Sequence, residues 1–173
     1  MFNPTRLTAR LAAFPDLLEV LVADTDDAEW RWKPDDRHWS ITEILGHLLR
    51  EEREDFRTRL RLTLESPAMP WPPIDPEGDV ARHRDINADP AQTLAAFRAE
   101  RADSIAWLRS LDAPDWNAEH AHPKLGLFRA GDLLAAWADH DALHARQLVK
   151  RRHQLIVRDA GPYPCRYAGE WTA

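Results

Sequence analysis

Two histidines in the last third of the chain have a spacing that suits metal binding. His140 and His144 lie four residues apart, in a run where Leu133, Trp137 and Leu148 recur at steps of three and four. At about 100° per residue, such steps place side chains on one face of a helix. Residues four apart lie one turn above the other. Both imidazoles can therefore point at a single ion.

The pair alone supports two interpretations equally. In the first, His140 and His144 are structural histidines, partly buried and paired with backbone or carboxylate groups. In the second, they share a cation, because two unpaired imidazoles buried side by side are costly polar groups. A metal site also needs a third ligand. Of the remaining histidines, only His47 falls within an amphipathic helical pattern; the others are His38, His83, His120, His122 and His153.

Periodicity places His47 on the flank of its apolar arc, beside Ile44 and Glu51. On this ground alone it is a boundary residue, paired with Glu51. Glu51 lies one turn after His47 and is a candidate to orient that ring, as carboxylates near metal-binding histidines commonly do. Asp141, next to the helical stripe, is a second candidate, unless it caps a loop or faces solvent.

Arg101 occupies an unusual place, at the centre of an apolar stripe between Phe97 and Ile105. A guanidinium there must be paired or solvated. We favour a buried ion pair with an acidic residue of the second predicted helix, such as Glu51 or Asp55, or extension of the side chain to the surface. The functional alternative is a clamp for the carboxylate of a substrate or thiol cofactor. Cys165 has no recognisable base nearby and is expected to be inert.

Four helical patterns would position these residues, and no convincing strand is present. The first contains Pro15, which we expect to kink or interrupt it. Ser40 with Glu43 forms a capping box for the second, and Asp89-Pro90 opens the third. The expected helices are residues 3–23, 40–64, 89–111 and 130–152.

Two long connections separate these helices. Residues 65–88 are rich in proline and form either a lid or a strap that crosses the bundle. Residues 112–128 form the second loop, where His120 and His122 are expected to have surface or hydrogen-bonding roles. The tail, residues 161–173, is expected to pack on the bundle, because its three aromatic side chains would otherwise lie in water. The predicted fold is all-α, a single-domain four-helix bundle with long crossover loops over residues 1–173.

Composition excludes several classes of protein. Hydrophobic residues make up 44% and charged residues 30%, which is not a disordered composition. The net charge of −6 lacks the basic footprint of a nucleic-acid binder. The single cysteine rules out a disulfide within the chain and fits the cytoplasm. No segment is apolar and long enough to span a membrane or to act as a signal peptide.

Two sequence runs resemble motifs of the DinB/YfiT-like family. Residues 39–48, WSITEILGHL, resemble its first motif, and residues 138–148, ADHDALHARQL, resemble its HDxxHxxQ signature. The similarity extends from about residue 7 to residue 148. It implies a four-helix bundle with a three-histidine metal site made of His47, His140 and His144. One departure is Arg129-Ala130, where the family commonly has a threonine or serine cap, so the start of the last helix is uncertain.

A three-histidine site leaves coordination positions open, unlike a closed structural zinc site. We expect a divalent ion, zinc or nickel being favoured over iron or manganese. It would activate water or a low-molecular-weight thiol for transfer to, or hydrolysis of, a small molecule. The alternative is a non-catalytic, stress-related binding module with a structural ion. We also expect a homodimer, because Trp107 lies away from the third helix's apolar stripe.

Overall fold

The first helix matches its prediction closely. The computed structural model describes residues 1–171, and all of their side chains except that of residue 77. Helix α1 spans Pro4–Val22, and the side chain of Asn3 accepts a hydrogen bond from the Arg6 amide at its start. The helix continues through Pro15, which is buried, so the expected interruption is wrong.

The second predicted helix is one continuous rod with an irregular middle. Helix α2 spans Ile41–Arg50 and α3 spans Arg57–Glu65. Between them, Glu51–Phe56 forms a π-helical turn, which the sequence did not predict. The expected capping box is confirmed: Ser40 accepts from the Glu43 amide, and the Glu43 carboxylate accepts from the Ser40 amide. This box fixes the start of α2, and therefore the face on which His47 lies two turns later.

The proline-rich connection is partly helical, contrary to the prediction of a loop over residues 65–88. Helix α4 spans Pro76–Arg82, and a 3₁₀ turn spans Asp85–Asn87. Asp75 caps α4 by accepting from the Gly78 amide. The 3₁₀ turn packs on α2, where the Asp85 carboxylate accepts two hydrogen bonds from Arg50, at 2.7 and 2.5 Å.

The third predicted helix, α5, spans Pro90–Ser110, with Asp89 as its cap. The second connection contains a small antiparallel hairpin, so the prediction of no strands is wrong. Strand β1 spans Glu119–His122 and β2 spans Gly126–Arg129, with His120 opposite Phe128. Gly126 turns the chain with a φ of +91°, a conformation that glycine adopts at no steric cost.

Helix α6 spans Ala130–Asp159, two turns beyond its predicted end at Arg152. It begins at the predicted residue, although the resemblance left that start uncertain. The Asp132 carboxylate accepts from the Arg129 amide, as the acidic residue of a capping box does. The helix continues because Leu155, seven residues after Leu148, extends the buried stripe.

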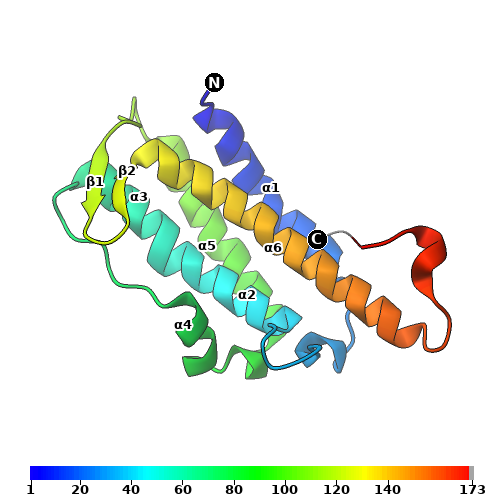
Figure 1. Ribbon diagram of the computed structural model, residues 1–173. Coiled ribbons are helices and arrows are strands. Elements are labelled where there is room, and N and C mark those ends of the chain that lie inside the picture. The colour runs from blue at the N-terminus through cyan, green and yellow to red at the C-terminus, as the bar shows by residue number, and fades with distance from the viewer. Residues whose placement is uncertain (172–173) are drawn as a thin grey trace.

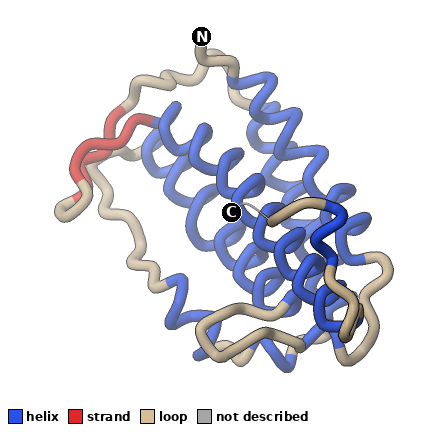
Figure 2. Tube along the Cα trace, turned by 45° about the vertical axis from the view of Figure 1, so that its right-hand side comes forward, coloured by secondary structure: helices blue, strands red, loops and turns tan. Residues whose placement is uncertain are grey.

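The last described residue of the tail packs on the bundle. Trp171 stacks on His153 with ring centroids 4.9 Å apart, after the chain has turned back along α6 (Figures 1 and 2). Tyr163 and Tyr167 are exposed, so the expectation of three packed aromatics is wrong for these two. Residues 172 and 173 of the predicted tail lie outside the described residues.

The four long rods form the predicted bundle (Figure 1). The hairpin lies at one end of the bundle, and α4 packs on α2. Helix α1 packs against α5 and α6, and α2 packs against the same two helices from the other side. The connection that carries α4 runs from the end of α3 along the bundle to the start of α5 (Figure 1). The core includes Phe14, Leu45, Phe97, Leu134 and Trp137, all buried. No helix within residues 1–171 is long and apolar enough to cross a membrane.

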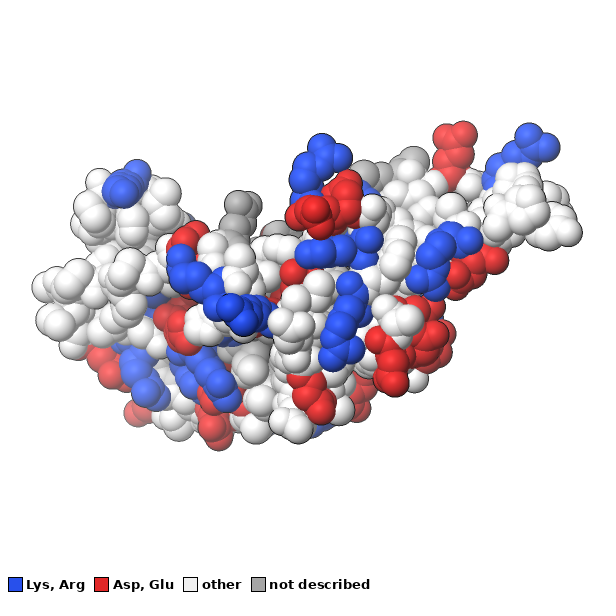
Figure 3. Space-filling view, turned by 90° about the horizontal axis from the view of Figure 1, so that it is seen from below, with Lys and Arg blue, Asp and Glu red and all other residues white. Residues whose placement is uncertain are grey.

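Basic and acidic side chains alternate over the face of the molecule seen in Figure 3. This agrees with the mixed charge pattern of the sequence. Trp107 is half-buried, with the Arg61 guanidinium 5.0 Å from its ring centroid. The ground on which we expected a homodimer is therefore removed, and the dimer itself stays a prediction.

Candidate metal centre

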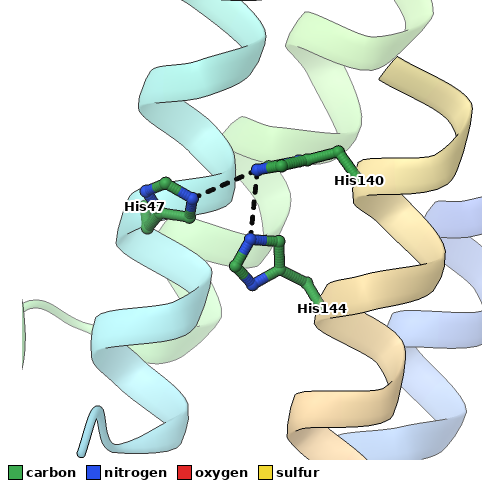
Figure 4. Close-up of side chains that lie close together, drawn as sticks. All are labelled: His47, His140 and His144. Atoms are coloured by element: carbon green, nitrogen blue, oxygen red, sulfur yellow. Dashed lines mark hydrogen bonds between the residues drawn. The ribbon is translucent and has the colours of Figure 1, made fainter. Parts of the chain in front are cut away.

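The structure brings the three histidines of the family motifs together in the interior of the bundle. His47 comes from the last turn of α2, and His140 and His144 come from consecutive turns of α6 (Figure 4). The Nε2 atom of His140 lies 3.2 Å from Nε2 of His47 and 3.1 Å from Nε2 of His144. One nitrogen from each ring lies within 4.8 Å of the others.

Burial of His47 differs from what periodicity indicated. Its side chain is not at a boundary, since the residue is only 4% exposed. The ring of Trp39 covers it, with centroids 4.8 Å apart, and also stacks near His144 at 6.4 Å. Phe56 covers His140 at 4.9 Å. Two aromatic rings thus shield the cluster. This shielding depends on tertiary packing, so helical periodicity cannot predict it.

All three imidazoles are neutral at neutral pH. Burial, with the neighbouring His144 and Arg50, lowers the pKa of His47 to about 3. Burial and the two other imidazoles lower the pKa of His140 to about 2. Burial also lowers the pKa of His144. Neutral imidazoles are the form that binds a metal, because each then has one nitrogen with a free lone pair.

Hydrogen bonding fixes which nitrogen of His144 carries the proton. The Nδ1–H of His144 donates to the Gln147 side-chain oxygen at 2.8 Å, which leaves Nε2 as a lone pair facing the cluster. Nε2 of His140 approaches both neighbours but can carry only one proton. The three nitrogens therefore cannot all satisfy one another by hydrogen bonds, whereas a cation satisfies all three.

Two of the three nitrogen pairs in the donor set have the spacing expected around such an ion. Two nitrogens bound tetrahedrally to one zinc ion, at about 2.0–2.1 Å each, lie about 3.3–3.4 Å apart. The observed separations of 3.2 and 3.1 Å are close to this value. Within residues 1–171 the group has three members and no fourth histidine, cysteine or carboxylate, so a position for water or substrate stays open.

Glu51, the predicted orienting residue, lies near His47 without bonding to it. Its Oε1 atom is 3.7 Å from His47 Nδ1, and that nitrogen has no hydrogen-bond partner among the described residues. Burial and the adjacent Asp55 raise the pKa of Glu51 to about 8. Asp55 in turn pairs with Arg59 at 2.5 Å.

Arg101 and Asp141, the other two predicted residues, form one buried ion pair. Arg101 donates to the two Asp141 oxygens at 2.6 and 2.9 Å and to the backbone oxygen of Leu11 at 2.9 Å. Its second carboxylate is Glu52, also at 2.9 Å. The expectation of a buried ion pair with an acid of the second predicted helix is confirmed, but that acid is Glu52 rather than Glu51 or Asp55, and Asp141 is a further partner. Asp141 neither caps a loop nor faces solvent.

This ion pair explains how the bundle positions His140. Asp141 follows His140 directly, and its link to Arg101 ties α6 to α5. The Trp137 indole donates to the Glu52 carboxylate at 3.0 Å and ties the same helix to the π turn. Because the two Arg101 amino groups already have partners within the protein, this residue is not a free anion clamp. Sequence reasoning missed Glu52, since nothing in the sequence marks the π turn.

The remaining histidines lie elsewhere. His120 is buried in β1, where its Nδ1 lies 2.9 Å from the Pro67 carbonyl oxygen and its ring stacks on Trp71. His122 Nδ1 accepts from the Lys124 and Leu125 amides. Both have the hydrogen-bonding roles that we expected. The 3₁₀ turn of Cys165 lies beyond α6, away from the cluster.

A surface groove borders His144, one of the three histidines of the cluster. It has a volume of about 470 Å³, and one side of it is the α6 face that carries His144 and Gln147. Gln147 also borders a second, shallower hollow beside Trp39. Gln147 was not predicted as a site residue, although its position three residues after His144 is the spacing at which helical side chains meet.

Comparisons with known proteins agree with this architecture. The model of the DinB superfamily matches residues 10–148, a range that includes all three histidines. A similar solved structure is described as "YfiT from Bacillus subtilis is a probable metal-dependent hydrolase with an unusual four-helix bundle topology"; the TM-score is 0.79, with 18% identity, over 88% of this chain and 87% of that one. A search of curated proteins gives no match. The structural likeness shows the fold, and the family match over most of the sequence shows that this chain belongs to the DinB superfamily.

Proposed function

We propose that this protein is a metal-dependent hydrolase of small molecules whose single divalent ion is held by His47, His140 and His144. The convergence of three neutral Nε2 atoms in a shielded interior site carries the proposal. The description of YfiT as a probable metal-dependent hydrolase supports the same chemistry for a protein of this fold.

The ion, when bound, would lower the pKa of a water molecule and supply a nucleophile near neutral pH. The chain's own residues hold and shield the site. Gln147 keeps the proton of His144 on Nδ1, and the Arg101–Asp141 pair holds the α6 turn that carries His140. Trp39 and Phe56 restrict water on two sides. Restricting water strengthens electrostatic interactions within the site.

Zinc or nickel is the ion we propose, since imidazole nitrogen suits both. The same open position would accept a low-molecular-weight thiol, which the ion would hold as thiolate. Transfer from a thiol is therefore the second activity to be assayed. We further propose that the substrate is a small molecule rather than a nucleic acid, in keeping with the mixed-sign surface and the net charge of −6.

The test combines metal content with turnover. Protein freed of any affinity tag should hold close to one equivalent of a divalent metal by elemental analysis, and His140→Ala should hold almost none. His83→Ala is the matched control, because His83 is exposed and far along the chain from the cluster. Wild-type protein should hydrolyse members of a panel of small esters and amides only when metal-loaded.

Each result has a distinct meaning. Metal in wild type and in His83→Ala, absent from His140→Ala, with metal-dependent hydrolysis, supports the proposal. Metal-dependent transfer from a thiol without hydrolysis would replace hydrolase by transferase. Bound metal with neither activity would favour the non-catalytic binding module. Equal metal content in wild type and His140→Ala would refute the site itself.

A further inference from the structure

Arg151 is a buried cation without a carboxylate partner. It lies on α6, seven residues after His144, and only 2% of its surface is exposed. Among the described side chains no carboxylate lies within 4.0 Å of its nitrogens, and its Nε has no hydrogen-bond partner. The one side-chain hydrogen bond found for it runs from Nη1 to the Gln154 oxygen, at 2.6 Å. A guanidinium buried in this way is costly unless something compensates its charge.

The nearest acidic groups are engaged with other cations. Asp35 and Glu43 both act on Arg151 through their charge and oppose the effect of burial, which lowers its pKa. Glu43, however, accepts from Lys33 at 3.1 and 3.3 Å, and Asp35 is hydrogen-bonded with Arg37 and His38. Neither carboxylate reaches Arg151.

Arg101 shows how this protein compensates a buried guanidinium when the role is structural. That residue is equally buried but has two carboxylates within hydrogen-bond distance, from Asp141 and Glu52. No described carboxylate among residues 1–171 lies within hydrogen-bond distance of Arg151. The contrast indicates that the missing negative charge comes from outside the fold.

Arg151 also lines the groove that reaches His144. Its neighbours there are Arg146 and Lys150, and none of the residues lining the groove is acidic. Leu143 and Trp171 provide an apolar wall. Because α6 is continuous from His140 to Arg151, the Cα atom of Arg151 lies about 10 Å along the helix axis from that of His144, at about 1.5 Å per residue.

We propose that this groove binds an oxyanion of the small-molecule substrate, a carboxylate or a phosphate, with Arg151 as its main binding residue. Arg146 and Lys150 add positive charge at the rim. The anion would hold one end of the substrate while the reacting group, several bonds away, lies at the three histidines. The position of the reacting group at the three histidines rests on the proposed hydrolase function. The anion site does not depend on that function.

Binding of small probes tests the anion site directly. Titrations followed by NMR, on metal-free and metal-loaded protein, would use butyrate, ethyl phosphate and the neutral butyramide. We expect one of the two anions to bind in both metal states, and the tighter of them identifies the source as carboxylate or phosphate. Arg151→Gln should weaken it at least tenfold, and Arg151→Lys should restore part of the affinity. Arg98→Gln, which removes an exposed arginine, should have no effect.

Several outcomes would overturn the anion site. These are equal affinity of the anion for wild type and Arg151→Gln, binding of butyramide as tight as that of the anions, or no binding of either anion. A thermal melt checks folding: Arg151→Gln should melt no lower than wild type, since it removes an uncompensated charge. If Arg151→Gln does not fold, the Arg146→Gln/Lys150→Gln variant replaces it, with an expected loss of twofold to fivefold; unchanged affinity would count against the proposal.

A pair of esters separates this inference from the proposed function. 4-Nitrophenyl butyrate is neutral, and the mono-4-nitrophenyl ester of glutaric acid carries a free carboxylate. If the bound anion is a carboxylate, wild type should prefer the charged ester through a lower KM, and Arg151→Gln should lose that preference. Absence of metal-dependent turnover of either ester would count against the hydrolase while Arg151-dependent binding of butyrate still supported the anion site. If butyrate is the anion that binds more tightly, metal-dependent turnover of both esters without any preference would support the hydrolase and count against the anion site.

Discussion

Arg101 on α5 and Asp141 on α6 form a bidentate ion pair in the interior of the bundle. Asp141 directly follows the proposed ligand His140. The pair is closed to water: Arg101 is 2% exposed and Asp141 is buried. It therefore links the folding of the bundle to the position of the candidate metal site.

Replacement of Arg101 by methionine should destabilise the protein strongly. The variant leaves the Asp141 and Glu52 carboxylates buried without a cation, and breaking a buried pair in this way typically costs about 3–5 kcal/mol. Chemical denaturation of Arg101→Met against wild type measures the loss. Arg98→Met is the matched control, since Arg98 also pairs with two acids but at the surface, where solvent screens the charges. A loss in Arg101→Met no greater than in Arg98→Met would contradict the structural role.

Helix positions could be predicted because their causes are local. The stripes of α1, α5 and α6 follow from spacing, and the caps Ser40 and Asp89 are visible as residue types. The end of α6 was placed too early, although Leu155 continues the stripe. Helix α4 begins with Asp75-Pro76, the same signal that opens α5, but the prediction of a loop over residues 65–88 did not use it. The short hairpin lacks a clear two-residue alternation.

Helical periodicity predicted only part of the candidate site. The i, i+4 spacing identified His140 and His144, whereas His47 entered through the family resemblance. Its burial depends on Trp39, from the segment before α2, and such tertiary contacts have no local signal. The sequence indicated an acid of the second helix as a partner of Arg101 but not which one, because the irregular turn at residues 51–56 was not predicted. The π turn changes the phase of the helix there and brings Glu52 to Arg101.

Gly46, directly before His47, should not tolerate a side chain. A Cβ atom added there would lie 2.6 Å from Cγ of Asp85, in the turn that docks on α2. Overpacking of this kind costs about 1–3 kcal/mol, so Gly46→Ala should lower the free energy of unfolding by that amount. Asp85→Ala removes the two closest atoms, Cγ and Oδ2, and leaves only Cβ at 2.9 Å, so the Gly46→Ala change should then cost less. Equal costs in the wild-type and Asp85→Ala backgrounds would show that the close contact is not what excludes the side chain.

Gln147 should control metal affinity more than Glu51 does. Gln147 accepts the Nδ1–H of His144 at 2.8 Å, whereas Glu51 stands 3.7 Å from Nδ1 of His47. Loss of a group that orients a metal-binding histidine typically weakens binding about 10–100-fold. Gln147→Leu should therefore fall in that range, and Glu51→Gln should have a smaller effect. Competition with a chromophoric chelator gives both affinities, and the reverse order would disprove the assignment.

Removal of the ion should lower the melting temperature of wild-type protein but not that of His140→Ala. An ion that binds only the folded chain stabilises it by RT ln(1 + [L]/Kd), about 2.7 kcal/mol when the free ion is at 100 times Kd. Thermal melts with excess chelator, and again after zinc or nickel is returned, measure this contribution. His83→Ala should behave as wild type, because its substitution lies on the surface. If chelator lowered the melting temperature of His140→Ala as much as that of wild type, the stabilising ion would lie outside the three-histidine cluster. The cluster would then not be the metal site.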